Sequence, residues 1–314
     1  MKSTLNNLVV LDASSIGDDL DFKRLDKFGI VSTYNYSSEF QISERIKNAT
    51  IIVTNKCLLN EKTLAKCIKL KLICIAATGI NNVDLKYCEK KSIEVLNVEG
   101  YSTKSVAQLT LTYSLHFLSS LAQYNDYCHK GDWIKSESFT HLGFRFENLE
   151  NKKWGIIGLG KIGKEVRHLA EAFGAEVSYF STSGQNENDR NHMSLDQLLK
   201  SSDIISIHCP LNKNTKNLIG EKELRQLKTN VILINVGRGG IINEKNLVSF
   251  MQKSEAMLAT DVLEHEPMRE DSAMKFLLGC SRVLMTPHIA WSSSESRELL
   301  FEKIIQNIEK SIKL

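Results

Sequence analysis

Three ionisable residues, Arg238, Glu266 and His288, each stand just beyond an apolar run that is typical of a β-strand. An arginine can hold a carboxylate through two parallel hydrogen bonds, which fixes its orientation as well as its charge. A carboxylate beside an imidazole stabilises the charged ring and fixes which nitrogen faces a substrate. Together the three residues could bind an acid and transfer a proton to it.

Each of these residues also has a plain structural interpretation: a surface charge, a turn residue, and a packed or solvated histidine. Their joint position at the ends of three strands of one predicted sheet favours a site, because ligands of open α/β sheets bind at that edge. His208 and His265 are rival histidines. We expect His208 to lie beside a cofactor cleft and His265 to be solvated.

A glycine-rich segment, Gly158-Leu159-Gly160-Lys161-Ile162-Gly163, lies between an apolar run and a helical pattern. In this context Gly158 permits a tight turn, Gly160 lets the backbone approach a pyrophosphate, and Gly163 lets helix and strand pack closely. The N-terminus of the helix offers N–H groups to phosphates. A glycine-rich turn without a ligand is the alternative, and the flanking pattern argues against it.

The next strand should end in an acidic residue that binds the adenosine ribose of NAD, but Ser181 stands there. Ser181, Thr182 and Ser183 could instead donate hydrogen bonds to the 2′-phosphate of NADP. No basic residue follows directly, and Arg190 is the nearest. The sequence therefore leaves the choice between NAD and NADP open.

Strand and helix patterns alternate in two series, which predicts two α/β domains with parallel sheets covered on both faces. Helical patterns include 61–70, 83–91, 105–121, 161–173 and 294–314, and the segment 126–150 reads as polar and loop-rich. The expected strands are 8–13, 31–36, 50–54, 72–77 and 94–97 in the first series, and 153–157, 176–180, 204–208, 231–236, 257–262 and 283–286 in the second.

The composition is that of a globular protein, with 42% hydrophobic and 25% charged residues among 314. A net charge of +3 gives no reason to expect nucleic acid or a membrane surface as partner. The seven cysteines are odd in number and include no C-x-x-C pair, so we expect reduced thiols, no zinc and a cytoplasmic protein. No signal peptide or membrane-spanning stretch is expected.

With these motifs in place, nearly the whole chain resembles the D-isomer-specific 2-hydroxyacid dehydrogenases. Within that family it is most similar to the glycerate dehydrogenase (hydroxypyruvate reductase) branch, through Gly100-Tyr101-Ser102 and His288-Ile289-Ala290-Trp291. The other matching motifs are Ala77-Thr78-Gly79-Ile80-Asn81-Asn82-Val83-Asp84, Ser105-Val106-Ala107-Gln108, the glycine segment, His208-Cys209-Pro210-Leu211, Asn235-Val236-Gly237-Arg238-Gly239-Gly240, Asp261 to Pro267, and Pro287-His288.

The resemblance implies a role for each matching residue. Arg238 would bind the substrate carboxylate, His288 would be the acid/base, and Glu266 would orient His288 and favour its protonated form. Backbone N–H groups would meet the same carboxylate. The residues implied to bind substrate through the backbone are Ala77, Thr78 and Gly79, and those implied to line the cofactor site are Gly158, Gly160, Lys161, Ile162, Gly163, Cys209, Pro210, Val236, Gly237 and Asp261.

The resemblance also implies an organisation of the chain. Residues 104–287 would form a Rossmann dinucleotide-binding domain, and residues 1–103 with 288–314 a flavodoxin-like substrate domain. The substrate would lie in the cleft between them, and the family implies a homodimer through 105–150. The segment Val98-Glu99-Gly100 lacks the proline that many relatives have there.

We therefore expect an NAD(P)-dependent oxidoreductase that moves a hydride between its cofactor and a small 2-keto acid or D-2-hydroxy acid. Hydroxypyruvate or glyoxylate, reduced to D-glycerate or glycolate, are the expected substrates. A dinucleotide-sensing binding module or corepressor of the same fold is the alternative, because fold does not fix function. The joint presence of Arg238, Glu266 and His288 argues against it.

Overall fold

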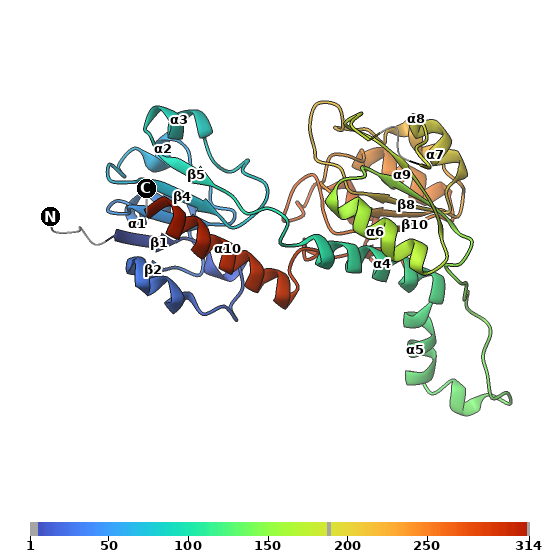
Figure 1. The fold of residues 1–314 in the computed structure, drawn as a ribbon. Coiled ribbons are helices and arrows are strands. Elements are labelled where there is room, and N and C mark those ends of the chain that lie inside the picture. Colours follow the sequence, from blue (N-terminus) through green and yellow to red (C-terminus); the bar gives the residue numbers. More distant parts are fainter. Residues whose placement is uncertain (1–5, 187–189, 313–314) are drawn as a thin grey trace. The chain divides into compact units, whose positions relative to one another are not determined.

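The chain folds into two compact units, Met1–Ser102 with Ser292–Leu314, and Thr103–Trp291. Figure 1 draws both units in a computed structural model that describes residues 6–186 and 190–312. The chain thus passes from the first unit to the second near residue 102 and returns near residue 292.

The first unit is built on a five-stranded sheet in which every neighbouring pair of strands is parallel. The strand order is β2-β1-β3-β4-β5, so the chain reverses direction across the sheet between β1 and β3. Buried runs such as Ile51–Thr54 and Leu72–Ile75 explain the pattern, because a strand covered on both faces is apolar throughout. The strands are β1 (Asn6–Val10), β2 (Gly29–Thr33), β3 (Ile51–Thr54), β4 (Leu72–Ile75) and β5 (Glu94–Leu96).

Helices cover both faces of this sheet. Val9, Ile52 and Ile73 pack in one cluster with the buried residues of α1, α2 and α3. The long C-terminal helix α10 packs against β4, and Arg24 ties it to the N-terminal part of the unit through Glu298, at 2.5 Å, and Glu302. The helices are η1 (Ala13–Ser15), η2 (Phe22–Phe28), α1 (Glu39–Arg45), α2 (Glu61–Leu64), α3 (Leu85–Lys90) and α10 (Ser294–Ile312).

The second unit contains a six-stranded parallel sheet with the order β11-β10-β9-β8-β6-β7. The chain here reverses between β6 and β8, the same point in the order as between β1 and β3 of the first unit. The strands are β6 (Lys153–Ile157), β7 (Glu176–Phe180), β8 (Ile204–Ile207), β9 (Ile232–Asn235), β10 (Met257–Thr260) and β11 (Val283–Met285).

Alternate residues of these strands face opposite layers of helices. Ile204 packs with α4 and α6, whereas its neighbour Ile205 packs with α7, α8 and α9, as the two-residue period of a strand requires. Trp154 is buried on the α4 side and donates its indole N–H to Ser206 Oγ at 2.8 Å. The helices are α4 (Thr103–Ser119), α6 (Lys161–Ala172), α7 (Leu195–Ser201), α8 (Glu221–Leu224), α9 (Glu244–Lys253) and η4 (Ala273–Leu277).

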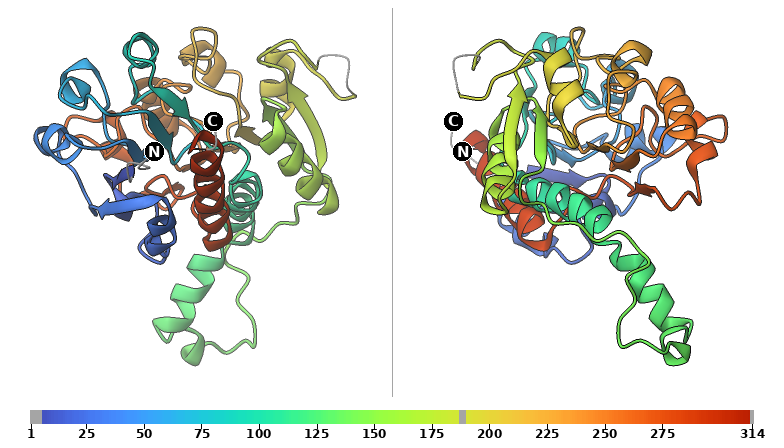
Figure 2. Two further views of the ribbon diagram at one scale, coloured as in Figure 1. Left: turned by 60° about the vertical axis from the view of Figure 1, so that its left-hand side comes forward. Right: turned by 90° about the vertical axis from the view of Figure 1, so that its right-hand side faces the viewer.

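An arm leaves the second unit after α4 and returns to it before β6 (Figure 2). It consists of α5 (Leu121–His129), η3 (Trp133–Lys135) and an extended return whose Glu147 N–H donates to Leu118 O. Stacking of Tyr127 on His141, with ring centroids 4.2 Å apart, holds its two sides together. The segment 126–150, expected to be loop, thus begins inside a helix.

The expected fold class, two doubly wound parallel-sheet α/β domains, is confirmed. The position of the second domain boundary differs. We expected residues from 288 onward to join the first unit, but 288–291 belong to the second. The reason is a set of hydrogen bonds to Asp261: His288 N–H donates to its backbone oxygen at 2.9 Å, and Ile289 and Ala290 donate to its carboxylate at 2.8 Å.

Candidate active site

Glu266 and His288 form a hydrogen-bonded pair in the second unit. His288 Nδ1 lies 2.7 Å from Glu266 Oε2, and about a quarter of the histidine side chain is exposed. The other carboxylate oxygen of Glu266 accepts the backbone N–H of Leu263 at 3.0 Å, so the carboxylate is fixed at both ends. Because Nδ1 faces the carboxylate, Nε2 is the ring nitrogen directed away from it. The pair can hold and release a proton at Nε2.

The backbone of His288 is left-handed, with φ of +57°. Few non-glycine residues adopt this region, and those that do need surrounding contacts to hold them there. Asp261 supplies those contacts, since it is 2% exposed and its carboxylate accepts the N–H groups of Ile289 and Ala290, which follow His288 in the turn. Burial raises the pKa of Asp261, and the donated hydrogen bonds, led by that of the Thr286 hydroxyl, oppose the rise.

Arg238 follows β9 in a turn that its neighbour Asn235 organises. Asn235 is buried, accepts the N–H of Gly237 at 3.1 Å and donates its amide to Arg238 O at 3.1 Å. The Arg238 side chain is exposed, and its Nη1 donates to Gly237 O at 2.8 Å. Its remaining N–H groups can meet a carboxylate. Val236 and Gly237 lie buried in the same turn.

The glycine segment follows β6, at the point where the strand order reverses between β6 and β8. Gly158 has φ of +95°, and a Cβ there would lie 2.9 Å from Cys209. A Cβ on Gly163 would lie 2.3 Å from Gly158 O, whereas one on Gly160 would meet no atom of the described chain within 4 Å. Two glycines therefore serve packing, and the third leaves room for a ligand.

Helix α6 begins directly after Gly160. Its first intrahelical hydrogen bond runs from Lys164 N–H to Gly160 O, so the N–H groups of Lys161, Ile162 and Gly163 precede it. Such a helix start attracts phosphate through its N–H groups and its dipole. The open face at Gly160 and this helix start fit a dinucleotide pyrophosphate.

His208, Cys209 and Pro210 follow β8 and face this region. Cys209 is buried against Gly158, and Pro210 is exposed. Both ring nitrogens of His208 are buried and have no hydrogen-bond partner among the described residues, although the residue as a whole is half-buried. Burial lowers the pKa of His208 to about 3, so its imidazole is neutral at physiological pH.

Ser181 is buried, and its hydroxyl is engaged within the loop that follows β7. It lies 2.5 Å from Asn186 Oδ1 and accepts the N–H of Gly184 at 3.1 Å. Asn186 also donates its amide to Leu159 O at 3.0 Å, which joins this loop to the glycine segment. Thr182 and Ser183 are more exposed. The hydroxyls with the best access to a ribose or phosphate are therefore those of Thr182 and Ser183.

In the first unit, the segment Ala77–Gly79 follows β4 and is tied to the segment after β5. Asn97 donates its amide to Thr78 O at 2.7 Å, the Thr78 hydroxyl donates to Val98 O, and Val98 N–H donates to Ala77 O. These contacts engage carbonyl oxygens and the hydroxyl, not the N–H groups of Thr78 and Gly79. The N–H groups thus suit an anion.

Several residues that support the site were not predicted. Thr286 donates to Asp261 at 2.5 Å and bonds the hydroxyl of buried Tyr113, and Glu244 accepts the N–H of Glu264. Burial raises the pKa of Tyr113 to about 12, so it remains a donor. No motif marks these residues, because each acts through a contact distant in sequence. Asn186 lies six residues after the end of β7 and is equally unmarked.

The described part of the chain offers neither a metal site nor a membrane-spanning helix. No group of histidine, cysteine and carboxylate side chains there could hold a metal ion, and all seven cysteines are free thiols. None of the helices in residues 6–186 and 190–312 is long and apolar enough to cross a membrane.

The chain is similar to known proteins over most of its length. Residues 111–290 match the sequence model described as the NAD binding domain of D-isomer specific 2-hydroxyacid dehydrogenases. The chain is 33% identical to a hydroxypyruvate reductase of Blautia hydrogenotrophica, over 98% of this chain and 97% of that protein. It is 30% identical to a glycerate dehydrogenase of Methylorubrum extorquens, over 92% and 94%.

A solved structure extends the comparison to the fold. The D-lactate dehydrogenase of Aquifex aeolicus, in complex with NAD and lactic acid, is 28% identical and superposes with a TM-score of 0.83 over 98% of this chain and 96% of that one. With most of the second unit matched by the sequence model and relatives of 30% and 33% identity over nearly the full chain, the chain belongs to the D-isomer specific 2-hydroxyacid dehydrogenases, a family of oxidoreductases.

Proposed function

We propose that this protein reduces a small 2-keto acid, hydroxypyruvate or glyoxylate, to the D-2-hydroxy acid. The observation that carries the proposal is the hydrogen-bonded pair of Glu266 and His288, on the sheet edge that also bears Arg238 and the glycine segment. The similarity to a hydroxypyruvate reductase and a glycerate dehydrogenase supports the choice of substrate.

The proposed donors to the substrate carboxylate are the Arg238 guanidinium and backbone N–H groups. Arg238 takes the carboxylate through the guanidinium N–H groups beyond its bond to Gly237 O, and a planar fork of donors fixes the plane of the acid. In the first unit, the N–H groups of the Ala77–Gly79 segment are further proposed donors to a carboxylate. This orientation presents the keto carbon to the cofactor and its oxygen to His288.

Proton transfer falls to His288. A bound nicotinamide cofactor supplies the hydride, and negative charge then grows on the keto oxygen. The protonated imidazole of His288 stabilises this charge and gives the Nε2 proton to the oxygen. Glu266 holds Nδ1 at 2.7 Å, so the ring keeps its orientation while its charge changes. In the reverse direction neutral His288 removes the hydroxyl proton.

For the cofactor, we propose that the N–H groups of Lys161, Ile162 and Gly163 hold the pyrophosphate over Gly160, and that Cys209, Pro210, Val236, Gly237 and Asp261 line the site. Because Ser181 replaces the ribose carboxylate, Thr182 and Ser183 contact the ribose, and either NAD or NADP is accommodated. A Ser181→Asp variant should lower kcat/KM for NADPH more than for NADH, because a carboxylate repels the 2′-phosphate.

The test is a steady-state assay of NADH and NADPH oxidation with hydroxypyruvate, glyoxylate and pyruvate. We expect turnover with at least one of the first two. Arg238→Gln should raise KM for the keto acid, and His288→Asn should lower kcat by about 10²–10⁴-fold. Tight NADH binding without turnover of any 2-keto acid would favour the alternative, a dinucleotide-sensing module.

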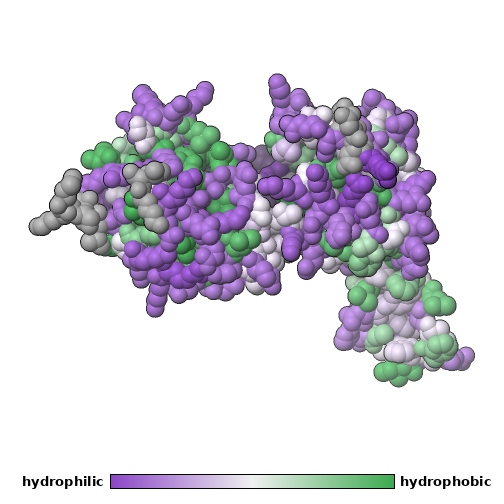
Figure 3. All heavy atoms as spheres, viewed as in Figure 1, coloured by the Kyte–Doolittle hydropathy of each residue, from purple (hydrophilic) through white to green (hydrophobic). Residues whose placement is uncertain are grey.

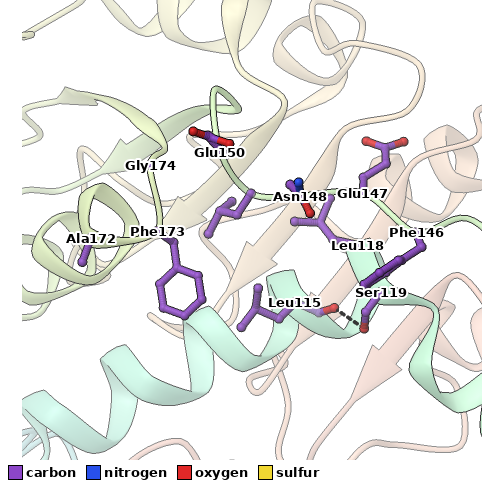
Figure 4. A pocket seen from close by; sticks show the side chains of 11 residues that line it. Leu115, Leu118, Ser119, Phe146, Glu147, Asn148, Glu150, Ala172, Phe173 and Gly174 are labelled. Atoms are coloured by element: carbon purple, nitrogen blue, oxygen red, sulfur yellow. Dashed lines mark hydrogen bonds between the residues drawn. The ribbon is translucent and has the colours of Figure 1, made fainter.

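We further propose a homodimer formed through the arm of the second unit. Large apolar side chains are exposed along it, including Ile134 and Phe139, each 90% exposed, and Figure 3 shows this apolar character over the arm. At its base a pocket of about 620 Å³ lies between α4, the returning segment 146–150 and the end of α6 (Figure 4). Apolar exposure of this extent is typical of protein interfaces.

The proposed partner at this surface is a second copy of the chain. Size-exclusion chromatography with light scattering should give about twice the mass of one chain, and Ile134→Asp with Phe139→Asp should give a monomer. Phe40→Asp, at a 95% exposed position of the first unit, is the matched control and should leave the mass unchanged. A monomeric parent protein would contradict the proposal.

A further inference from the structure

The turn from Leu263 to Glu266 sets the position of the Glu266 carboxylate. Within the turn, Leu263 N–H donates to Glu266 Oε1 at 3.0 Å. From outside it, Glu244 at the start of α9 accepts the N–H of Glu264 at 2.6 Å. This bond is charge-assisted, and such bonds are roughly twice as strong as neutral ones.

The bond between Glu244 and Glu264 lies on the side of the turn that faces α9. A hollow of about 360 Å³ lies there, lined by residues that include Glu244, Glu264, His265 and Arg269. The side chains that line the hollow are mostly polar, whereas Leu263 of the turn packs against the apolar cluster that includes the buried residues of α9. On the other side the backbone at Gly239 lies against Leu263, close enough that a Cβ on Gly239 would stand 1.9 Å from Leu263 O.

Glu244 is not needed to cap its own helix. Asn243 is the N-cap of α9, and its side chain accepts the N–H of Asn246 at 3.1 Å. The Glu244 carboxylate instead points out to the neighbouring turn. Glu244 thus stands in the first turn of α9, where an acidic residue is favourable, and in addition makes a contact outside the helix.

We propose that Glu244 is a positioning residue for proton transfer. By accepting the Glu264 N–H, it holds the Leu263–Glu266 turn in place, and the Glu266 carboxylate thereby stays within hydrogen-bond distance of His288 Nδ1. The inference rests on the proposed function, in which His288 is the acid/base. A displacement of about 1 Å in such a constellation costs on the order of a hundredfold in rate.

The charges around Glu244 are consistent with this role. Burial is the main cause that raises the pKa of Glu244; the Glu264 N–H opposes the rise, and the carboxylates of Glu264 and Glu266 add to it. His265 acts in the opposite direction. Glu244 therefore lies within electrostatic reach of Glu266 without contacting His288.

The test compares three variants with the parent protein. Glu244→Ala removes the acceptor, and Glu244→Gln keeps an amide oxygen that can accept the same N–H. Glu244→Asp keeps the charge but withdraws it by one methylene. Glu221→Gln is the matched control, because Glu221 also begins a helix of this unit but pairs with Arg225 and not with the turn.

We expect Glu244→Ala and Glu244→Asp to lower kcat about tenfold or more while KM for NADH changes less than about twofold. Glu244→Gln should restore most of kcat, and Glu221→Gln should match the parent. In ¹⁵N NMR of the ring nitrogens, Glu244→Ala should shift neutral His288 from the Nδ1–H tautomer toward a mixture, because the Glu266 carboxylate no longer fixes the proton on Nδ1. A merely structural role would leave this tautomer unchanged in a folded variant.

An unchanged kcat and an unchanged tautomer in Glu244→Ala would overturn the proposal. If Glu244→Ala does not fold, an unchanged kcat and an unchanged His288 tautomer in Glu244→Asp would overturn the proposal instead. The NMR readout needs no turnover, so it tests Glu244 even if the parent protein reduces none of the keto acids. That last result would instead contradict the proposed function.

Discussion

The two sheets of this protein share the order of their first five strands but differ at the point where that order reverses. In the first unit Asp12 fills the space between the ends of β1 and β3. Its carboxylate accepts the N–H groups of Asn55 at 3.0 Å and Lys56 at 2.7 Å, and the hydroxyl of Thr54 at 2.8 Å. In the second unit Gly158–Gly163 occupies the corresponding place.

The difference shows that the same strand order can have a filled crevice in one sheet and an open crevice in another. A reversal of strand order always leaves a crevice at the carboxyl ends of the strands. In the first unit the protein satisfies the N–H groups there with its own buried carboxylate. In the second unit an open face at Gly160 and the N–H groups at the start of α6 leave that role to a ligand.

The largest effect should follow from opening the closed crevice. Asp12→Ala removes the acceptor for the buried N–H of Asn55, the partly buried N–H of Lys56 and the Thr54 hydroxyl, and we expect it to lower the free energy of unfolding by about 4 kcal/mol. Chemical denaturation followed by circular dichroism measures the loss. Asp18→Ala, at an exposed carboxylate of the same unit, should change stability by less than about 0.5 kcal/mol. Equal stability of the two variants would show that Asp12 does not hold this crevice.

A smaller loss of stability should follow from adding a side chain at Gly163, the tightly packed glycine of the crevice in the second unit. Gly163→Ala places a Cβ 2.3 Å from Gly158 O, a backbone atom that cannot move without shifting the turn. We expect a loss of about 3 kcal/mol, net of the gain that alanine brings inside a helix. Thermal unfolding without cofactor is the measurement, and a variant as stable as the parent would mean that the turn yields easily.

His208 provides a pH-dependent difference between the crevices. Its counterpart after β3 is Asn55, whose amide donates to Ser15 O at 2.9 Å, whereas both ring nitrogens of His208 lack a described partner. Burial lowers the pKa of His208 to about 3, so below about pH 6.5 the unfolded chain takes up a proton that the folded protein does not. Stability from this group is complete above about pH 6.5 and declines as pH falls toward 3.

The corresponding measurement is the free energy of unfolding at pH 7 and pH 5. Between these values the parent should lose about 2 kcal/mol more than His208→Phe, which keeps an aromatic ring without a titrating group. Parallel pH profiles of the two proteins would mean that the folded protein protonates His208 as readily as the unfolded chain does.

The smallest effect on stability should come from Gly160→Ala. Its φ of −79° suits alanine, and a Cβ there meets no described atom within 4 Å, so unfolding should change by less than about 0.5 kcal/mol. The same Cβ would stand where the pyrophosphate is proposed to bind. We expect the Kd of NADH, measured by fluorescence titration, to rise about tenfold, or about 1.4 kcal/mol. Unchanged affinity would place the pyrophosphate elsewhere.

The fold could be predicted because its signals are local. Runs such as Ile204–Ile207 are apolar throughout, and the helical period after Gly160 is uninterrupted, so the strands and the parallel sheets follow. The glycine segment and the residues at the strand ends carry motifs of their own. Their assignment to catalysis and cofactor binding stays a prediction.

What the sequence could not predict are contacts between residues distant along the chain. Nothing near Ser181 indicates that its hydroxyl faces Asn186, and nothing near Glu244 indicates a bond to Glu264. The same holds for the second domain boundary. The N–H groups of residues 289 and 290 bind Asp261, and these residues therefore belong to the second unit. Loop geometry of this kind depends on packing that no periodicity encodes.

The left-handed backbone at His288 restricts which replacements of this residue are informative. Asparagine and aspartate tolerate φ near +57° better than alanine, valine or phenylalanine do. An alanine variant would therefore combine loss of the imidazole with a distorted turn, and its inactivity would be ambiguous. His288→Asn retains the turn while removing the proton donor, and is thus the form with which to trap and co-crystallise an unreacted ternary complex.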